Sequence, residues 1–349
     1  MPSKKVTIVT ITLILLLSWW MHEELSPLYD EMQALKKPRY ELGEHKGAEF
    51  CANCHQEIYD QWAKSSRHVT ATTTQSFHDY KDKFTNNFLL NAVMGEDMCY
   101  ACHGSKKVNK GVDCEACHGI ANSNVPIMET HAKKFKPDRE KLKKSKFCGD
   151  CHEIKNPLSG DFIISTYHDW QTSEAAENGM TCQACHMKPR KGKTSYHGFD
   201  AMIRNPEIYN GDISINDVKL QFPNLNLVIE NHILGHGIPP VGPSRVLGLE
   251  IIFKDHKGNE FHKTIHTFSK KFSLMPIAGI MPYKLIKDTQ LRSGEKRSLS
   301  YNLPAELLKE NIAGVELSLR FYDVSDEHQG DIAKAHWVSS PILTKEVTF

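Results

Sequence analysis

The chain has 349 residues, a length that suggests about two domains. Hydrophobic residues make up 40% of the chain and charged residues 24%, which excludes a chain that is disordered throughout. The 43 Lys and Arg residues nearly balance the 42 Asp and Glu residues, and the net charge of +1 argues against nucleic-acid binding through a basic surface.

The N-terminus carries an apolar run, residues 6–21, directly after Lys4 and Lys5. At a helical rise of about 1.5 Å per residue the run reaches about 24 Å, slightly less than a hydrocarbon core of about 30 Å. No small-residue cleavage site follows the run, and Trp19 and Trp20 near its outer end suit a membrane interface. These features favour an uncleaved anchor over the alternative, a cleaved signal peptide.

We therefore predict a single N-terminal transmembrane helix within residues 1–22, embedded in the cytoplasmic membrane through residues 6–21. The two lysines before the run place the N-terminus in the cytoplasm and the bulk of the chain on the periplasmic or outer side. Residues 23–46 are polar and mixed in charge, and we expect them to form a short helical stalk.

All ten cysteines lie in Cys-x-x-Cys pairs, and a histidine directly follows each pair. The cysteines are Cys51, Cys54, Cys99, Cys102, Cys114, Cys117, Cys148, Cys151, Cys182 and Cys185, and the histidines are His55, His103, His118, His152 and His186. Histidine makes up roughly 5% of the chain, so five coincidences have a chance probability of roughly 5 × 10⁻⁷. Cys-x-x-Cys-His is the attachment motif of c-type haem: both thiols bind its vinyl groups, and the imidazole binds its iron as proximal ligand.

Disulfides and zinc sites account for the cysteine pattern less well. A disulfide framework needs cysteines spread over the fold rather than five tight pairs. Zinc sites use Cys-x-x-Cys pairs, but five pairs cannot be matched two by two, and zinc needs no histidine after each pair. We therefore predict five covalently bound c-type haems, numbered 1 to 5 along the chain. Because such haems are attached outside the cytoplasm, the chain must be exported.

Residues 47–205 are predicted to form a pentahaem domain. Successive motifs begin 48, 15, 34 and 34 residues apart. This spacing leaves too little protein per haem to build a core without the cofactors, so the haems should form the core, wrapped by short helices and loops. The short spacing between Cys99 and Cys114 makes haems 2 and 3 close neighbours, and a chain of close haems is a route for electrons.

Residues 206–349 contain no haem motif and consist of β-rich, alternating runs separated by turn signals. The runs are Val218–Phe222, Leu225–Glu230, Arg245–Phe253, Phe261–Phe268, Tyr283–Leu291, Arg297–Leu303, Val315–Tyr322 and Ile342–Phe349. Short strands at regular spacing predict an antiparallel β-sandwich. The expected fold class is therefore α+β: a haem-packed domain of short helices and loops followed by an antiparallel β-sandwich, with the transmembrane helix before them.

Longer segments around the haem motifs are also distinctive. They are Cys51–His55 with Ile58–Trp62 and Ser66-Arg67-His68 after it, Gly111–Gly119, Phe147–His152, Thr166–Trp170, Gly179–Met187, and Asn231–Gly242 with its Gly235-His236-Gly237-Ile238-Pro239 turn. In these segments the chain resembles the multihaem cytochromes related to cytochrome c-554 and hydroxylamine oxidoreductase. The resemblance covers most of residues 48–260 and implies a haem-packed electron carrier or a subunit of a redox complex. The Gly-His-x-x-Pro turn is similar to one that opens a β-domain in such proteins.

Each haem iron needs a second, distal ligand or stays open, and neutral histidine is a good ligand for it. The resemblance implies that His68 is the distal ligand after the first haem and that His131 binds the iron of a neighbouring haem. His197 after the fifth motif and His236 in the Gly-His-x-x-Pro turn are further candidates. If His236 is a ligand, the β-domain is tied directly to the haem core.

The fifth distal ligand stays open between His168, His78 and His45. His168 is flanked by Trp170 and could equally be a packing residue on a helix. Three methionines, Met98, Met128 and Met187, are lesser candidates, because methionine is more often a core residue.

These observations predict a membrane-anchored pentahaem c-type cytochrome that relays electrons between a membrane quinol or redox complex and a periplasmic or extracellular acceptor. Redox proteins are the expected partners, and a basic stretch before the fourth motif either balances haem propionates or docks an acidic partner. No catalytic residue is assigned. Two alternatives remain: an oxidoreductase acting on a small nitrogen or sulfur compound at one open haem, and a wire-forming subunit of a homo- or hetero-oligomer.

Overall fold

A computed structural model describes most of the chain beyond the expected stalk. The described residues are 47–65, 78–79, 81–82, 86, 99, 102–104, 111–118, 139–156, 159–189, 195–199, 211–240, 242–274, 282–305, 307, 312–324 and 331–349. The expected anchor and stalk, residues 1–46, lie outside this set. Within the set, no helix is both long enough and apolar enough to cross a membrane.

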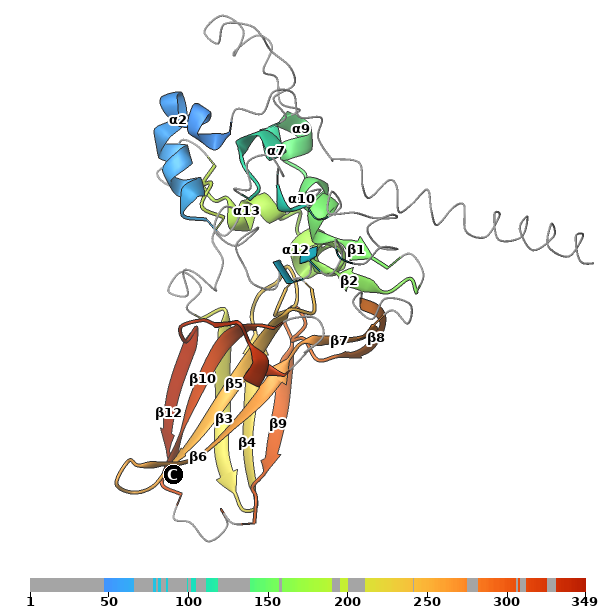
Figure 1. Cartoon of the computed structure of the whole chain (residues 1–349). Helices are drawn as coiled ribbons and strands as arrows, with labels where there is room; N and C mark the ends of the chain where they lie inside the picture. Colours follow the sequence, from blue (N-terminus) through green and yellow to red (C-terminus); the bar gives the residue numbers. More distant parts are fainter. Residues whose placement is uncertain are drawn as a thin grey trace, which may run out of the picture.

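Short helices carry the haem motifs (Figure 1). The first motif begins in α2 (Ala48–Ala63), and α7 (Cys114–His118), α10 (Ser145–His152) and α13 (Cys182–His186) carry the third, fourth and fifth. Between them lie α9 (Arg139–Leu142), α11 (Thr166–Gln171), α12 (Glu174–Glu177) and a hairpin of β1 (Ile154–Lys155) and β2 (Phe162–Ile164). Helices this short are unstable in isolation, as expected where a cofactor supplies the core.

Side-chain caps fix the first turn of two motif helices. The Asp113 carboxylate accepts a hydrogen bond from the backbone N–H of Ala116 at 3.1 Å, and the Thr181 hydroxyl accepts one from Ala184 at 3.2 Å. Each cap satisfies a backbone donor that the helix itself leaves unpaired. The two cysteines of each motif therefore stand on a defined helical turn.

The C-terminal half forms two antiparallel sheets and a separate hairpin. Its strands are β3 (Ile213–Gln221), β4 (Asn224–Asn231), β5 (Arg245–Lys254), β6 (Glu260–Phe268), β7 (Lys270–Leu274), β8 (Pro282–Asp288), β9 (Lys296–Asn302), β10 (Gly314–Asp323), β11 (Trp337–Val338) and β12 (Leu343–Thr348). One sheet has the order β11-β10-β5-β6, with β12 also paired to β10, and the other has the order β3-β4-β9. All these pairs are antiparallel.

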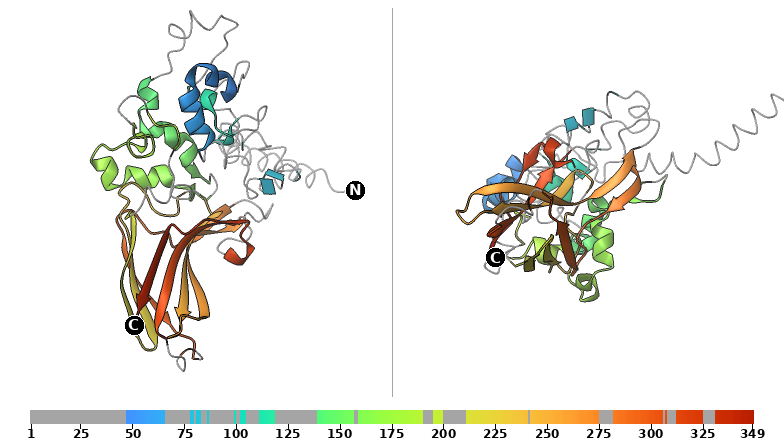
Figure 2. Two further views of the ribbon diagram at one scale, coloured as in Figure 1. Left: turned by 90° about the vertical axis from the view of Figure 1, so that its left-hand side faces the viewer. Right: turned by 90° about the horizontal axis from the view of Figure 1, so that it is seen from below.

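Both sheets contribute to one apolar core, so the C-terminal half is a sandwich. β4 places Leu225, Leu227 and Ile229 in this core at 1% exposure or less, and residues of β5 and β10 pack against them from the other sheet. Alternation of buried and partly exposed residues along β4 produces this face. The predicted α+β class is therefore confirmed. Helices cover one end of the sandwich, and the C-terminus lies at the other end (Figures 1 and 2).

Two sequence expectations about the β-half were wrong in detail. The run that begins at Tyr283 belongs to β8, which pairs with β7 in a two-stranded sheet of its own beside the helical part, and not with the sandwich (Figure 1). In addition, the Gly-His-x-x-Pro turn does not open the β-domain, because β3 and β4 precede it and it connects β4 to β5. Alternation reports burial on one face of a strand, but it does not reveal the sheet to which the strand belongs.

Candidate haem-ligand sites

Two histidines from different halves of the molecule face each other at the fifth motif. The imidazoles of His186, on α13, and His236, in the turn between β4 and β5, have ring centroids 6.2 Å apart and planes inclined by 8°. Two imidazoles bound to opposite faces of one haem iron have centroids about 6.3 Å apart, because each metal–nitrogen bond is about 2 Å and each ring centre lies about 1.1 Å further out. The observed separation therefore fits two axial ligands of one iron.

A second pair has the same geometry at the third motif. The rings of His118, on α7, and His197 have centroids 6.1 Å apart and planes inclined by 24°. The donor set around each pair, two cysteines and two imidazoles, is that of a c-type haem with two histidine ligands. Residues from distant parts of the chain thus meet in two places at the spacing that a haem requires.

Backbone carbonyls select the protonated nitrogen of both distal candidates. The Nδ1 atom of His236 lies 2.9 Å from the carbonyl oxygen of Gly237, and the Nδ1 atom of His197 lies 2.8 Å from that of Ser195. A carbonyl oxygen only accepts hydrogen bonds, so Nδ1 must carry the proton in each case. The Nε2 lone pair then remains for a metal, the arrangement by which proteins orient histidine ligands.

Burial keeps these imidazoles neutral. It lowers the pKa of His236, against the opposing effects of the Gly237 carbonyl and the Asp169 charge. Burial also lowers the pKa of His118, helped by the charges of His197 and His55, and it lowers the pKa of His197. Neutral imidazole is the form that binds iron, so these environments favour ligation.

A hydrogen-bonded frame holds the turn that carries His236. Asn231, which is fully buried, donates its side-chain amide to the carbonyls of Leu291, at 3.3 Å, and Arg292, at 2.8 Å. The backbones of Ile238 and Leu291 exchange two hydrogen bonds on the other side of the turn. A Cβ atom on Gly237 would lie 3.1 Å from the carbonyl oxygen of Leu291, so the close approach favours glycine at this position. The sandwich therefore fixes the turn from both sides.

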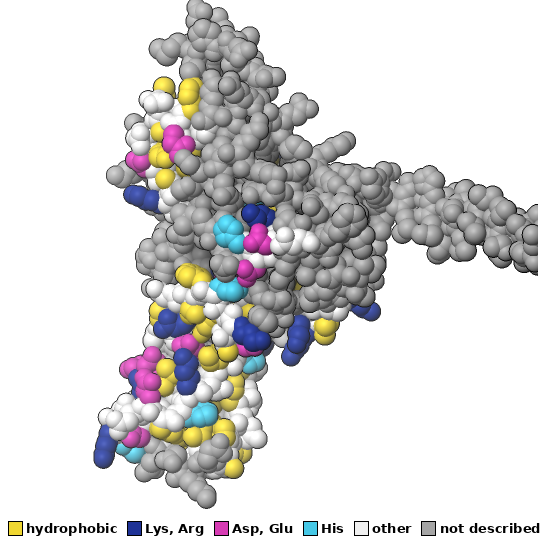
Figure 3. Space-filling model, in the orientation of Figure 1, with side chains coloured by type: hydrophobic (Ala, Val, Ile, Leu, Met, Phe, Trp, Pro, Cys, Tyr) yellow, Lys and Arg dark blue, Asp and Glu magenta, His cyan; other side chains and the backbone are white. Residues whose placement is uncertain are grey.

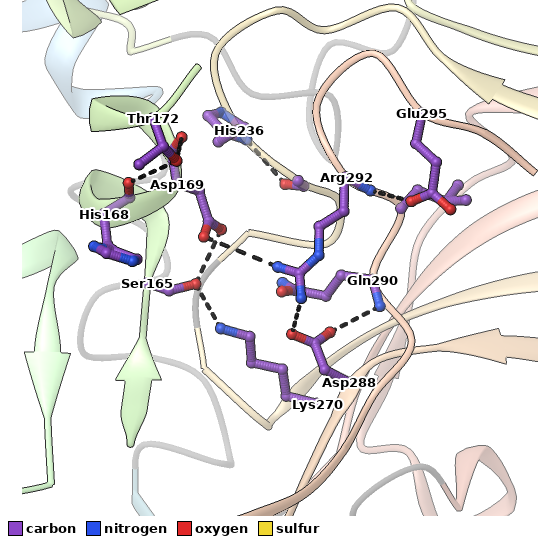
Figure 4. Close-up of polar contacts among 12 residues, drawn as sticks. Ser165, His168, Asp169, Thr172, His236, Lys270, Asp288, Gln290, Arg292 and Glu295 are labelled. Atoms are coloured by element: carbon purple, nitrogen blue, oxygen red, sulfur yellow. Dashed lines mark hydrogen bonds and ion pairs between the residues drawn. The ribbon is translucent and has the colours of Figure 1, made fainter. Parts of the chain in front are cut away.

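Charged side chains join the turn and the β7–β8 hairpin to α11 (Figure 4). The buried Lys270 amine donates to the Ser165 hydroxyl, which donates in turn to the Asp169 carboxylate at 2.9 Å. Arg292 pairs with Asp288 at 2.6 Å and reaches Asp169 at 4.0 Å. Burial lowers the pKa of the Lys270 amine, while the charges of Asp169 and Asp288 oppose this change. The contact between the two halves is thus polar, with two cationic and two anionic side chains, and its hydrogen bonds fix how the halves fit together.

The haem motifs are also in contact with one another. The side chain of Cys114 lies next to that of Cys51, so the first cysteines of motifs one and three are neighbours. A Cβ atom on Gly104, directly after the second motif, would lie 1.9 Å from the carbonyl oxygen of Gly111, so motif two touches the segment before motif three. Haems 2 and 3 were expected to be neighbours, and the chain segments that carry them do meet.

Motifs four and five are joined in a similar way. The backbone N–H of Cys182 donates to the Ser145 hydroxyl at 3.0 Å, and the Gln183 side chain donates to the carbonyls of Leu142, at 2.7 Å, and Lys144, at 3.0 Å. Helix α13 is therefore fixed against the start of α10, and their two attachment sites are adjacent.

The remaining distal candidates have different surroundings. His168 is exposed, and its ring stacks on Phe162 with centroids 4.3 Å apart, without a ring contact to any histidine among the described residues. His68, His131 and His45 lie outside the described residues. His78 is described, and the neighbouring Asp79 pairs with His336 of the β-domain at 3.1 Å. The alternative role of His168 as a packing residue is therefore supported by its contact with the Phe162 ring.

The sequence singles out the segments of Gln61, Trp62 and Trp170 but assigns these residues no role in positioning the ligands. The Gln61 side chain accepts a hydrogen bond from the backbone N–H of His197 at 2.9 Å across 136 residues of sequence. The indoles of Trp62 and Trp170 donate to Val112, at 2.8 Å, and Met180, at 3.0 Å, directly before two haem motifs. Glutamine and tryptophan are common in helices and do not by themselves indicate contact with a haem ligand. The signal in the sequence was their place in the two Tyr-x-x-Trp segments.

Two comparisons with known proteins found similar proteins. Residues 50–119 match the family of cytochrome c554 and c-prime. The fold is similar to that of a penta-heme cytochrome c552 from Thermochromatium tepidum, with a TM-score of 0.59 and 19% sequence identity over 87% of this chain and 98% of that chain. None of the curated proteins matches the chain. The matches support a relationship between this chain and the multihaem c-type cytochromes, whose cofactor is covalently bound c-type haem.

Proposed function

We propose that the chain is a pentahaem c-type cytochrome that relays electrons, anchored in the cytoplasmic membrane by residues 6–21 with its bulk on the periplasmic or outer side. The observation that carries the electron-transfer proposal is the spacing of the two histidine pairs, 6.1 and 6.2 Å between ring centroids. An iron with both axial positions filled by histidine is suited to electron transfer rather than substrate binding. Five complete motifs, and a similar fold described as penta-heme, support five haems.

The protein's own residues would hold the cofactors and set their environment. When bound, each haem would supply an iron that gains or loses one electron. The carbonyls of Ser195 and Gly237 keep His197 and His236 in one tautomer and orientation. A rigid ligand set lets an iron change its oxidation state with little rearrangement, and partial burial stabilises the less charged state.

Partners are proposed to be redox proteins: a membrane quinol-oxidising complex, or another cytochrome. Basic side chains before and within α10 support a docking role, since Lys143, between α9 and α10, and Lys146, in α10, have side chains that are 69% and 63% exposed beside the fourth motif. Each pairs with one carboxylate of the same segment, Lys143 with Glu140 at 2.9 Å and Lys146 with Asp150 at 3.9 Å. Elsewhere the two signs are interspersed, as on the face of the β-domain in Figure 3. A redox partner with an acidic face would be steered toward the basic helices.

The mature protein tests these proposals directly. Pyridine haemochrome per polypeptide should give five haems, and four or fewer on fully matured protein would contradict the pentahaem assignment. The reduced protein should pass electrons to a soluble cytochrome acceptor without turning over nitrite, hydroxylamine or sulfite; turnover of any of these would favour an enzyme instead. N-terminal sequencing of the membrane fraction should begin at or near Met1, whereas a soluble form that begins near residue 27 would exclude the anchor.

A further inference from the structure

The proximal histidines of the two pairs, His118 and His186, lie in segments that repeat each other in sequence. Helix α2 begins Ala48-Glu49-Phe50-Cys51 and helix α10 begins Ser145-Lys146-Phe147-Cys148, each directly before the remainder of a haem motif. Downstream of these, Tyr-x-x-Trp-x-x-Ser occurs at residues 59–65 and again at 167–173. Further along, each copy has the segment Gly-x-x-Cys-x-Ala-Cys-His, which contains another haem motif, at residues 111–118 and 179–186. The order of the three segments is the same in both copies.

The two Tyr-x-x-Trp-x-x-Ser segments are also similar in local structure. Tyr59 and Trp62 have ring centroids 5.6 Å apart, and Tyr167 and Trp170 have ring centroids 5.5 Å apart. The serine three residues after each tryptophan is buried, and its backbone N–H donates to the tryptophan carbonyl at 2.8 and 3.0 Å. The similarity is therefore one of conformation as well as of residue type.

The haem motif at the end of each copy starts in the same way. Gly111 and Gly179 have φ angles of 77° and 69°, a left-handed conformation that favours glycine. The next-but-one residue, Asp113 or Thr181, caps the helix that carries the cysteines. Two copies with matching turns and caps are more simply explained by a duplicated unit than by chance.

Each tryptophan contacts the segment on the proximal side of one histidine pair. The Trp62 indole donates to the carbonyl of Val112, two residues before Cys114, and the Trp170 indole donates to the carbonyl of Met180, two residues before Cys182. These carbonyls precede the motif helices and have no place in their hydrogen-bond ladders. The indole therefore fixes the start of the motif whose histidine, His118 or His186, belongs to the pair.

The same helix turn also contacts the distal side of the pair. In the first copy, Gln61, next to Trp62, accepts a hydrogen bond from the backbone of His197. In the second copy, a Cβ atom on Gly235, directly before His236, would lie 3.9 Å from Cδ1 of Trp170. A single turn of helix thus lies beside both flanks of one pair of imidazoles in each copy, with a hydrogen bond on the distal side in the first copy and close approach in the second.

We propose that the haem domain contains two copies of one two-haem unit, motifs one with three and four with five, and that Trp62 and Trp170 are equivalent positioning residues. Trp62 would position the histidines of the His118–His197 pair, and Trp170 would position those of the His186–His236 pair. Motif two lies inside the first copy, between Trp62 and Val112, and has no counterpart in the second, which explains why these partners are 50 residues apart in one copy and 10 in the other. The inference rests on the proposed haem ligation.

The test measures how many haems per mature, full-length protein bind carbon monoxide, which enters only open or weakly ligated irons. Trp170→Leu and Trp62→Leu should each open one haem, with the haem count unchanged. Trp170→Phe keeps the ring beside Gly235 but loses the N–H donor, so a smaller fraction of the same haem should react. The matched control is Trp337→Leu, an indole on β11 that is 43% exposed and belongs to neither repeated segment, which should match the parent protein.

Double variants assign each tryptophan to its iron. Trp170→Leu with His236→Ala should open one haem in total, because both changes act on the same site, whereas Trp62→Leu with His236→Ala should open two. His197→Ala should behave in the opposite way. Combined with Trp170→Leu it should open two haems, and combined with Trp62→Leu it should open one. If Trp170→Leu adds a second open haem to His236→Ala, or if both tryptophan variants leave all haems closed, the positioning role is wrong.

Haem counting separates this inference from the proposed function. A parent protein with fewer than five haems would contradict the pentahaem proposal, while the tryptophan variants could still behave as expected. Loss of a haem in both the Leu and the Phe variants would show that the indoles act in maturation, and would overturn the positioning role without affecting the pentahaem assignment.

Discussion

His186 and His236 lie 6.2 Å apart between ring centroids, although 50 residues separate them and one belongs to a helix and the other to a turn of the β-sandwich. Such a separation, with the two ring planes nearly parallel, fits an iron between two imidazoles. The turn of His236 is braced by Asn231 and Leu291 within the sandwich. The β-domain would therefore contribute part of a redox site, beyond any role in docking.

His236→Ala tests this relationship first. The variant should convert one low-spin haem to high spin, open it to carbon monoxide and raise its reduction potential, because neutral imidazole stabilises ferric iron and its loss leaves a weaker ligand. The haem count should not change, since thioether attachment does not use His236. Visible and electron paramagnetic resonance spectra report the spin state. A variant that remains fully low-spin would exclude His236 as a ligand.

His197→Ala and His168→Ala form a matched pair. His197 faces His118 at 6.1 Å and is half-buried, whereas the exposed His168 stacks on Phe162. We expect His197→Ala to open one haem to carbon monoxide and His168→Ala to leave every haem closed. The opposite result, an open haem in the His168 variant alone, would assign His168 as the fifth distal ligand and remove His197 from the ligand set.

Gly149, between the cysteines of motif four, should not tolerate a side chain. A Cβ atom at this position would lie 2.6 Å from the Tyr167 ring, which is itself buried. Gly149→Ala must displace either that ring or helix α10, so we expect a haem deficit at motif four or a loss of stability of about 1–3 kcal/mol. The measurements are haem per chain and the urea midpoint.

A second substitution shows whether the clash is the cause. Tyr167→Leu makes room beside α10, and in that background Gly149→Ala should have less than half of its original effect. An undiminished effect in the double variant would mean that the ring is not what requires glycine at position 149.

The sequence was informative where chemistry demands a short local pattern. Cys-x-x-Cys-His identifies haem attachment without any knowledge of the fold, and alternation along Leu225–Glu230 predicted β4 to within one residue at each end. Both signals are local: one is a spacing of three residues, and the other is a period of two.

Long-range relationships were only partly accessible. The candidate His236 could be named from its Gly-His-Gly setting, but its proximity to His186 depends on how the sandwich meets α11 and α13. The hairpin of β7 and β8 was missed because Ser269 is the only residue between β6 and β7, which leaves no turn signal. The repeat around Trp62 and Trp170 was hidden by the different lengths of the intervening chain.

The sandwich has its own charge cluster, and it makes stability depend on pH. The carboxylate of Glu250 on β5 accepts hydrogen bonds from Tyr322 at 2.6 Å and Arg320 at 3.3 Å, and it pairs with Lys263 at 3.0 Å. Burial alone would raise the pKa of Glu250, but the hydrogen bonds from Tyr322 and Lys263, together with the charges of Lys263 and Arg320, outweigh it and lower the pKa. The ionised form is therefore favoured by folding.

Because the folded pKa of Glu250 lies below the unfolded value of 4.5, its contribution to stability is present above that pH and is lost as the pH falls through the folded pKa. Glu250→Gln should lower the free energy of unfolding by about 1–2 kcal/mol at pH 7, since charge-assisted hydrogen bonds are lost, and the difference from the parent should shrink below about pH 4.5. Urea unfolding followed by circular dichroism of the β-sheet signal measures it. The exposed Glu260→Gln is the control and should differ from the parent by less than about 0.5 kcal/mol. A Glu250→Gln effect that is constant from pH 7 to pH 3 would show that packing, and not the charge of Glu250, is what the variant removes.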